Sequence, residues 1–415
     1  MATEREFDHY DPEFIKDPYA VYARLRDGCP VAHTSKQGGF WMLSRYADVR
    51  SALQDWQSFS SATPGTVALP NYHARDYPVL PIESDPPAHG KYRGLTRDVF
   101  SREAVDRLEP AVREIARGLI DGFIQRGTCD LVCDYALPLV SHALAKFLNL
   151  PVEDADRWVF WAREIFEGRM GDPARIDRAV AAMGAYVDEL MAARLAQPLD
   201  DVFSLLTRAR VDGAALSALE LRGYGMLLLT AGREATVDGI DNALWFLAEH
   251  PTERAWLRTH AADTAAVRCA VEEFLRAMSP IQLLGRIATR DTTLHGVTIP
   301  KGASLGVLYG AANRDESEFP QAERCLLDRR RNPHLAFGVG AHTCLGAHLA
   351  RLDMRVAITE FLQRIPEFTL ADDPVWAANG DTRGMRRLQV SFQPPPGPLQ
   401  TGSALGHSDQ PEVDR

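Results

Sequence analysis

The chain has 415 residues, of which 46% are hydrophobic and 25% are charged. This composition is typical of an ordinary globular protein that buries a sizeable core, and excludes a disordered chain. The formal net charge of −10 argues against a nucleic-acid-binding protein, because such proteins carry basic surfaces.

Six cysteines are scattered along the chain, at Cys29, Cys129, Cys133, Cys269, Cys325 and Cys344. Only Cys129 and Cys133 are close to each other in the sequence, and no second pair completes a zinc site. The polar N-terminus carries no signal peptide, and the sequence has no apolar run long enough to cross a bilayer. We therefore expect a reduced, cytoplasmic protein without a membrane anchor.

The N-terminal quarter is predicted to combine short helices with strand-like pieces and a long loop. We expect a helix after Asp17-Pro18, a strand near 40–43 and a helix over 46–54. The stretch 56–83 is rich in Ser, Thr, Pro and Gly and has no apolar period. A loop of that length inside a compact protein is often functional.

A helix with proline in its first turn is expected after this loop. It begins at Asp85-Pro86-Pro87 and places His89 and Arg93, four residues apart, on the same face. Taken alone, such a pair is a weak signal, since it is also common on solvated helix faces.

Residues 102–212 predict a succession of helices. Two amphipathic segments, over 153–170 and 173–195, are separated by Gly171-Asp172-Pro173. A single longer helix is expected next, from a capping box at 217–220 to His250. At 1.5 Å per residue, this helix would be about 50 Å long.

The long helix contains glycines at positions 223, 225, 232 and 239. Inside a helix each glycine costs about 1 kcal/mol relative to alanine. We expect the close approach of a ligand to Ala231-Gly232 to offset this cost.

Glu273 and Arg276 lie three residues apart on a further predicted helix, over 264–278. They can form an ion pair, which by itself stabilises a helix by only about 0.2–0.5 kcal/mol. Extended segments follow this helix, with a turn at His295-Gly296.

The most distinctive stretch is a glycine-rich loop with one cysteine, Phe337-Gly338-Val339-Gly340-Ala341-His342-Thr343-Cys344-Leu345-Gly346. It leads directly into an apolar-periodic helix that ends before Pro366. The free N–H groups and the dipole at that helix N-terminus favour a thiolate at Cys344. The glycines leave room for a large flat group. Together these features predict a single thiolate ligand for a metal.

The pattern Phe-Gly-x-Gly-x-His-x-Cys-x-Gly matches at all six fixed positions, and it resembles the haem-ligand loop of cytochrome P450 monooxygenases. Further segments resemble that family in the same order, over residues 10–393. The resemblance implies a mainly α fold with small β-sheets, in one domain over 1–393, with haem between the long helix and the cysteine-loop helix. Residues 394–415 are polar and proline-rich and are expected to form a disordered tail.

The resemblance also implies roles for individual residues. Cys344 would be the iron ligand, and Glu273 and Arg276 would be structural, joined by Arg324 or by one of Arg329 to Arg331. Haem contacts are implied for His89, Arg93, Ala231, Gly232, Arg286, Phe337, Gly338 and His342. A substrate pocket is implied for Leu228, Ala231, Ala235, Leu283, Leu284 and Met385, with the helices around Gly171 as its lid.

Residues 231–236, Ala-Gly-Arg-Glu-Ala-Thr, depart from the family pattern Ala-Gly-x-(Asp/Glu)-Thr. Glu234 supplies the acid of the proton path, but Ala235 stands where the alcohol is expected, and Thr236 follows one residue later. One residue turns a helical side chain by about 100°, so Thr236 cannot simply replace the missing alcohol. A substrate hydroxyl or amide, an ordered water, or a local bulge of the helix could complete the path. The remaining alternative is a slower enzyme that wastes electrons.

The expected function is haem-dependent monooxygenation of a small organic substrate in natural-product biosynthesis. Haem b would be the cofactor and O₂ the co-substrate. Electrons from NAD(P)H would arrive through a separate ferredoxin and ferredoxin reductase, because the chain has no nucleotide-binding motif. Basic residues expected to dock the ferredoxin are Lys91, Arg97, Arg329, Arg330, Arg331, Arg351 and Arg355.

We expect a monomer that binds neither nucleic acid nor a membrane. Two alternative functions differ in the chemistry that they require. One is oxidative coupling or ring formation on the same haem, and the other is a haem protein that senses a gas without turning over a substrate.

Overall fold

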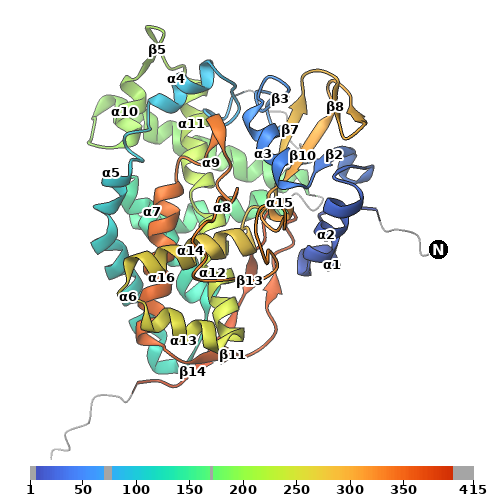
Figure 1. The fold of residues 1–415 in the computed structure, drawn as a ribbon. Helices are drawn as coiled ribbons and strands as arrows, with labels where there is room; N and C mark the ends of the chain where they lie inside the picture. Colours follow the sequence, from blue (N-terminus) through green and yellow to red (C-terminus); the bar gives the residue numbers. More distant parts are fainter. Residues whose placement is uncertain (1–5, 70–76, 169–171, 396–415) are drawn as a thin grey trace, which may run out of the picture.

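The computed structural model describes residues 6–69, 77–168 and 172–395, and most of them form helices (Figure 1). The largest β-sheet lies to one side of the helical body. The mainly α fold with small sheets is therefore confirmed. Gly171 and the tail from residue 396 onward lie outside these ranges. Within the ranges, each helix is too short or too polar to span a bilayer.

A five-stranded sheet joins the start of the chain to its second half, with the strand order β1-β2-β10-β7-β3. Strand β10 runs parallel to β2 and antiparallel to β7. The predicted strand 40–43 and helix 46–54 are confirmed. The elements of this part are α1 (Pro12–Lys16), α2 (Tyr19–Gly28), β1 (Val31–Thr34), η1 (Lys36–Gly38), β2 (Phe40–Leu43), α3 (Tyr46–Gln54), β3 (Phe59–Ser60), β7 (Leu283–Ala288) and β10 (Ser304–Leu308).

The helical body consists of amphipathic helices whose apolar faces meet in one large core. In α6, Val112, Ala116, Ile120 and Phe123 recur at helical spacing, and all four are buried. The elements here are α4 (Ala88–Gly94), α5 (Arg102–Asp106), α6 (Glu109–Phe123), η2 (Ile124–Arg126), β4 (Thr128–Asp130), η3 (Leu131–Ala136), α7 (Leu137–Phe147), η4 (Val152–Asp154), α8 (Ala155–Gly168), α9 (Pro173–Ala196), α10 (Val202–Arg208), β5 (Arg210–Val211) and β6 (Ala214–Ala215).

The helix predicted over 217–250 is interrupted, and the expectation of one continuous helix is wrong. Helices α11 (Ala218–Ala231) and α12 (Glu234–Glu249) are separated by Gly232 and Arg233. Arg233 has φ −120° and ψ −63°, outside the helical region, so the ladder of hydrogen bonds is interrupted there. The capping box that begins α11 is confirmed, with Ser217 and Glu220 bonding to each other's backbone.

Contacts between helices and loops account for most of the glycines in this region. A Cβ atom at Gly223 would lie 1.8 Å from the Pro78 carbonyl oxygen, and one at Gly239 would lie 3.0 Å from the Met354 sulfur. Gly225 is crowded in the same way. Close packing of the chain therefore explains why these three positions are glycines.

The remaining elements bring the end of the chain back onto the helical body. Strand β14 pairs with both β11 and β4, and α14 has the predicted bounds. These elements are α13 (Pro251–Thr259), α14 (Thr264–Met278), β8 (Thr292–Leu294), β9 (Val297–Ile299), α15 (Tyr309–Ala312), η5 (Gly340–His342), α16 (Ala347–Arg364), β11 (Phe368–Leu370), β12 (Val375–Trp376), β13 (Met385–Arg387) and β14 (Gln389–Phe392).

Candidate active site

A tight backbone turn just before α16 holds Cys344 in place. The Cys344 N–H donates to the Phe337 carbonyl oxygen at 2.8 Å, and the Gly338 N–H donates to the Leu335 carbonyl oxygen at 2.7 Å. Gly338 and Gly340 have φ angles of 66° and 82°, which residues with a side chain rarely adopt. The glycines of the motif therefore give this loop its shape.

The Cys344 thiol is surrounded by protein and nevertheless has accessible surface. Burial raises its pKa, while the Gly346 N–H and the charges of Arg93 and Arg351 lower it. The N–H group at the helix N-terminus thus acts in the expected direction, toward a thiolate, but in the chain by itself the desolvation of the sulfur outweighs it. A metal cation bound to the sulfur would displace the proton.

Four basic side chains from three separate elements gather near this thiol. His89 and Arg93 come from α4, Arg286 from β7, and His342 from η5. The ring centroids of His89 and His342 are 4.2 Å apart. Arg93 lies close enough to Cys344 for their charges to interact. The structure thus brings together four of the residues for which the family resemblance implies haem contacts.

This basic cluster is suited to an anionic group. Burial, followed by the charges of His89, Arg286 and Arg93, lowers the pKa of His342 to about 3. Burial and Arg93 also lower the pKa of His89. Nε2 of His342 lies 3.0 Å from Oγ of Ser61, whereas the buried Nε2 of His89 has no hydrogen-bond partner among the described residues. Two neutral imidazoles and two guanidiniums attract negative charge.

The broken helix contributes the segment in which the sequence lacks the expected alcohol. Ala231, at the end of α11, is exposed. The N–H groups of Thr236 and Val237 both donate to the Arg233 carbonyl oxygen, at 2.9 and 3.0 Å, so α12 starts afresh from Arg233. A local departure from regular helix, one of the three explanations considered, is therefore present as a break. Thr236 is buried, and Ala235 lies in the first turn of α12.

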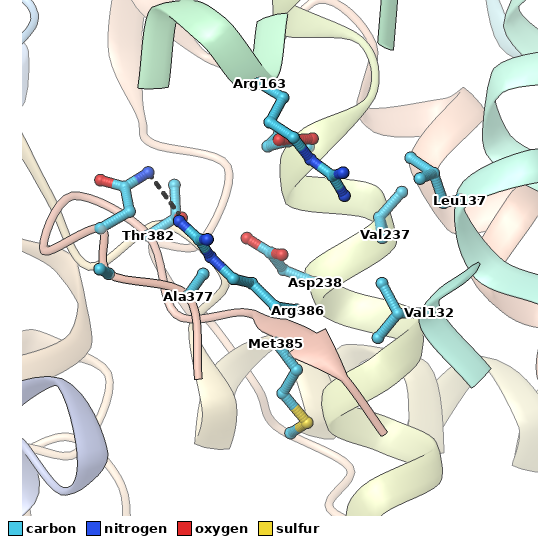
Figure 2. Close-up of a pocket in the computed structure, with 12 residues that line it drawn as sticks. Val132, Leu137, Arg163, Val237, Asp238, Ala377, Thr382, Met385 and Arg386 are labelled. Atoms are coloured by element: carbon cyan, nitrogen blue, oxygen red, sulfur yellow. Dashed lines mark hydrogen bonds between the residues drawn. The ribbon is translucent and has the colours of Figure 1, made fainter. Parts of the chain in front are cut away.

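A cavity of about 80 Å³ lies beside the first turns of α12 (Figure 2). Figure 2 shows Arg163 from α8 and Arg386 from β13 extending toward the space that Asp238 borders. Two of the residues predicted for the site, Glu234 and Met385, contribute to its wall. The full lining is Val132, Leu137, Arg163, Glu234, Val237, Asp238, Ala377, Ala378, Asn379, Thr382, Met385 and Arg386.

The pairing of Leu283 with Leu284 as pocket residues is wrong. Both belong to β7, where successive side chains point to opposite faces of the sheet. Leu283 is completely buried and packs into the N-terminal apolar cluster around Tyr22. Leu284 belongs to the other side of the sheet. Leu228 is buried on α11, and neither it nor Leu284 contributes to the cavity in Figure 2.

Glu273 and Arg276 form a doubly hydrogen-bonded ion pair inside the protein. The two bonds are 2.8 and 2.9 Å long, and both side chains are fully buried. Arg329 joins them, with its Nε 3.0 Å from a Glu273 oxygen, while Arg324 offers only its carbonyl oxygen to Arg276. Arg329 is therefore the third member that the sequence left open. Because its side chain is 8% exposed, its prediction as a ferredoxin contact is wrong.

Comparisons with known proteins agree with this geometry. The family model for cytochrome P450 matches residues 185–375. The vitamin D(3) 25-hydroxylase of Pseudonocardia autotrophica is 35% identical over 409 residues, which cover 95% of this chain and 98% of the relative. The chain belongs to the cytochrome P450 family.

Two further relatives support this assignment. The P450 monooxygenase PikC of Streptomyces venezuelae is 33% identical to this P450, with 92% of each chain covered. The structure of the bacillaene polyketide synthase P450 PksS of Bacillus subtilis is similar, with a TM-score of 0.84, 29% identity, and coverage of 93% of this chain and 99% of the other. This P450 is an oxidoreductase of the monooxygenase class.

The family uses haem and O₂, and the residues of this chain fit a haem. One cysteine is the single sulfur in the loop that precedes α16, and no group of three His, Cys, Asp or Glu side chains in the described ranges forms another metal site. The basic cluster beside it suits the carboxylates of a porphyrin, and the unpartnered Nε2 of His89 is a donor or acceptor ready for such a group.

Sequence reasoning missed several polar residues near α12. Asp238 and Asp241 follow Glu234 at positions four and seven along the helix, and both are buried. Arg163 and Arg386 line the cavity from other elements. The two aspartates had a detectable signal, since acids at that spacing lie on one face of an otherwise apolar helix. The two arginines had none, because only the fold brings them there.

Proposed function

We propose that this P450 hydroxylates a small organic molecule in natural-product biosynthesis, with electrons supplied by NAD(P)H through a separate ferredoxin and ferredoxin reductase. The observation that carries the proposal is the accessible thiol of Cys344 beside four basic side chains. Relatives named for a polyketide synthase and for vitamin D(3) hydroxylation support an organic substrate of this kind.

Cys344 would bind the haem iron, and His89, Arg93, Arg286 and His342 would hold the haem carboxylates. Bound haem supplies the activation of O₂ and the oxidation of the substrate. Phe337 and Gly338 would support the proximal face, and Ala231 with Gly232 would border the distal face.

The residues on the distal side of the haem would position the substrate and the proton. Met385, in the cavity wall, and Leu228 with Leu284 would contact the substrate. Glu234 would hold a proton near the distal face, beside Ala235 and Thr236. Its carboxylate lies 3.0 Å from the Arg233 guanidinium, which keeps it oriented. Glu273 and Arg276 would fix the core behind the cysteine loop.

The docking surface for the ferredoxin is narrower than the sequence suggests. Arg351 and Arg355 are bound by Glu272 and Glu109, and Lys91 is paired with Asp212. Arg97 and Arg331 also pair with acids, Asp98 and Glu318, but their side chains remain 74% and 78% exposed. Arg330 is exposed as well. We propose that these three arginines attract an acidic ferredoxin.

The protein would work as a monomer with one domain over residues 1–393, in the cytoplasm. The pairing of β14 with β4 supports the single domain, because it ties the end of that range to its first third. The six free cysteines are consistent with a reducing compartment.

The decisive experiment is the spectrum of the reduced holoprotein with carbon monoxide. The wild type should show the absorption band of thiolate-bound haem, and Cys344→Ala should lose it. Cys269→Ala, which removes a partly exposed cysteine far along the chain, is the matched control and should keep the band. A thiolate-type band in Cys344→Ala would refute the ligand assignment.

Product mass then identifies the reaction. After a screen of compounds for a shift of the haem absorption, a gain of one oxygen atom would support hydroxylation. A loss of two hydrogen atoms would indicate oxidative coupling instead. Haem that binds gases normally, with no product and no reductase-dependent oxygen consumption, would indicate a gas sensor.

A further inference from the structure

Helix α12 carries three acidic residues on one face. Glu234, Asp238 and Asp241 are spaced by four and three residues, so their Cβ atoms are neighbours along the helix, about 5–6 Å apart. Glu234 lies at the break before α12, and Asp241 lies two turns further from it. Glu234 and Asp238 also share the wall of the cavity in Figure 2.

The two aspartates are buried with fewer partners than a buried carboxylate requires, since within the described ranges Asp238 is hydrogen-bonded only by Thr382 through one oxygen and Asp241 through neither. Asp238 is 6% exposed and Asp241 is completely buried. Oδ2 of Asp238 and both carboxyl oxygens of Asp241 have no hydrogen-bond partner among the described residues. Since an ionised carboxylate is strongly disfavoured in such a place, each is neutral and carries a proton that it can pass on.

The charges around this face support that assignment. Burial, and then Glu234, raises the pKa of Asp238 well above its usual range, although Thr382 and Arg233 act against this. Burial, followed by Asp238, Asp130 and Glu234, raises the pKa of Asp241. Arg163 and Arg386 also border the cavity, and each makes a further interaction of its own.

Asp130 provides the link toward solvent. It is the last residue of β4 and caps the N-terminus of η3, which packs against α12, and it is partly exposed. Its Oδ1 accepts the N–H groups of Val132 and Leu388, both at 3.1 Å, which fix the carboxylate in place. Asp130 is the group through which a proton lost from Asp241 can be replaced from water.

We propose that Asp130, Asp241 and Asp238 form a proton relay that feeds Glu234, and thereby supplies the proton path that lacks its usual alcohol at Ala235. The inference rests on the proposed monooxygenase function. At each step one carboxyl O–H bond breaks and one forms on the next carboxyl, and Asp130 takes its replacement proton from water. Monooxygenation of a substrate RH consumes O₂, two protons and two electrons and yields ROH and water, so the relay must supply two protons per turnover.

The spacing on the helix allows this transfer. Neighbouring carboxyls at positions i, i+3 and i+4 can meet directly or through one ordered water. Glu234 is the catalytic member, since it lies beside the site where the protons are used. Asp238, Asp241 and Asp130 act through it and are positioning residues.

The test compares Asp241→Asn with a matched control in the holoprotein. Asp353→Asn removes a carboxyl on α16 that is 1% exposed, and burial alone raises the pKa of that carboxyl. It therefore repeats the chemical change on another helix, at a carboxyl that is not among the groups that shift the pKa of Asp238 or Asp241. The electron source is NADPH with a ferredoxin and its reductase, and oxygen consumption is measured in H₂O and in D₂O without added substrate.

We expect Asp241→Asn to slow oxygen consumption at least about tenfold and to enlarge the ratio of the rates in H₂O and D₂O. Asp238→Asn should act in the same way, while Asp353→Asn should match the wild type. Asp241→Glu should restore part of the rate. Infrared spectra of the ferric holoprotein should show a protonated carboxyl band that Asp241→Asn removes, which is a readout independent of turnover.

The outcomes separate this relay from the proposed function. If the wild type lacks the thiolate-type spectrum with carbon monoxide, the proposed function fails. If that spectrum is present in all variants, and the rate and isotope ratio of Asp241→Asn equal those of Asp353→Asn, the relay is refuted and the function stands. Loss of the infrared band of the protonated carboxyl in Asp241→Asn, without any change in the rate of oxygen consumption, would also refute the relay.

Discussion

Helices α12 and α14 both carry buried carboxyl groups, but the surroundings of these groups differ. On α14, Glu273 accepts hydrogen bonds from Arg276 and Arg329. On α12, Asp241 has no hydrogen-bond partner in the described part of the chain. Both side chains are completely buried, so depth alone does not decide the state of an acid in this protein.

The difference shows which region is built to hold charge and which to move it. A carboxylate between two guanidiniums is an ion-pair network that fixes the core next to the cysteine loop. A neutral carboxyl without partners leaves its own proton available. The paired region therefore serves structure, and the unpaired region is suited to proton transfer.

The largest expected effect comes from breaking the paired region. Glu273→Gln leaves Arg276 and Arg329 buried without their counter-ion, which should cost about 3–5 kcal/mol of folding free energy. Denaturant unfolding of the holoprotein measures this loss, and haem content should fall with it. Glu103→Gln on α5, which changes an acid whose side chain is 90% exposed, is the control. A variant with wild-type stability and haem content would contradict the structural role.

A smaller effect is expected from the pH dependence of stability, which should have opposite signs for acids on α14 and on α12. Burial raises the pKa of Glu272, but hydrogen bonds from Arg351 and His334 outweigh it and hold this pKa at about 2. Its extra stability is therefore present above about pH 4.5 and is lost as the pH falls toward 2. Glu272→Gln should lower stability near neutral pH by at most about 3 kcal/mol, with the loss vanishing in acid.

Asp241→Asn should show the reverse dependence. Because the folded-state pKa of Asp241 is raised, the wild type loses stability as the pH rises through and above the unfolded value near 3.8. The stability of the variant relative to the wild type should therefore increase from acid to neutral pH. Thermal unfolding of Glu272→Gln and of Asp241→Asn, each compared with the wild type across this pH range, measures the sign of each change in stability. Parallel curves for Asp241→Asn and the wild type would mean that Asp241 is ionised in the folded protein.

The smallest effect on stability, and a specific effect on function, is expected from Ala235→Thr. This change restores the hydroxyl expected beside Glu234, in the first turn of α12. It should change the fraction of electrons that reach product, measured as product formed per NADPH consumed. Ala231→Ser is a nearby change that adds a hydroxyl before the break, and serves for comparison. An unchanged electron yield would place residue 235 outside the proton path.

Local patterns in the sequence predicted the parts of this fold that local interactions determine. The bounds of α3 and α14 follow from their apolar period, and the turn at Gly338 and Gly340 follows from the need for positive φ. The cluster of His89, Arg93, Arg286 and His342 was predictable only through the family resemblance, because it joins three distant segments.

The remaining features depend on tertiary packing. The break at Gly232 and Arg233 has no proline to announce it, and helix-forming residues flank it on both sides. The raised pKa of Cys344 reflects the protein that surrounds the sulfur, which a helix-dipole argument does not include. Similarly, the neutral state of Asp241 depends on the absence of a cation from neighbouring elements, and no spacing along α12 reveals that.

Gly384 joins the wall of the cavity in Figure 2 to the acidic face of α12. A Cβ atom there would lie 1.8 Å from Oδ1 of Asp238, and the next residue, Met385, lines the cavity. Positions 238 and 384 are therefore expected to covary among homologous sequences, since a larger residue at one requires a smaller or absent side chain at the other. Engineering of this loop for new substrates would have to leave Gly384 unchanged, or replace it together with Asp238.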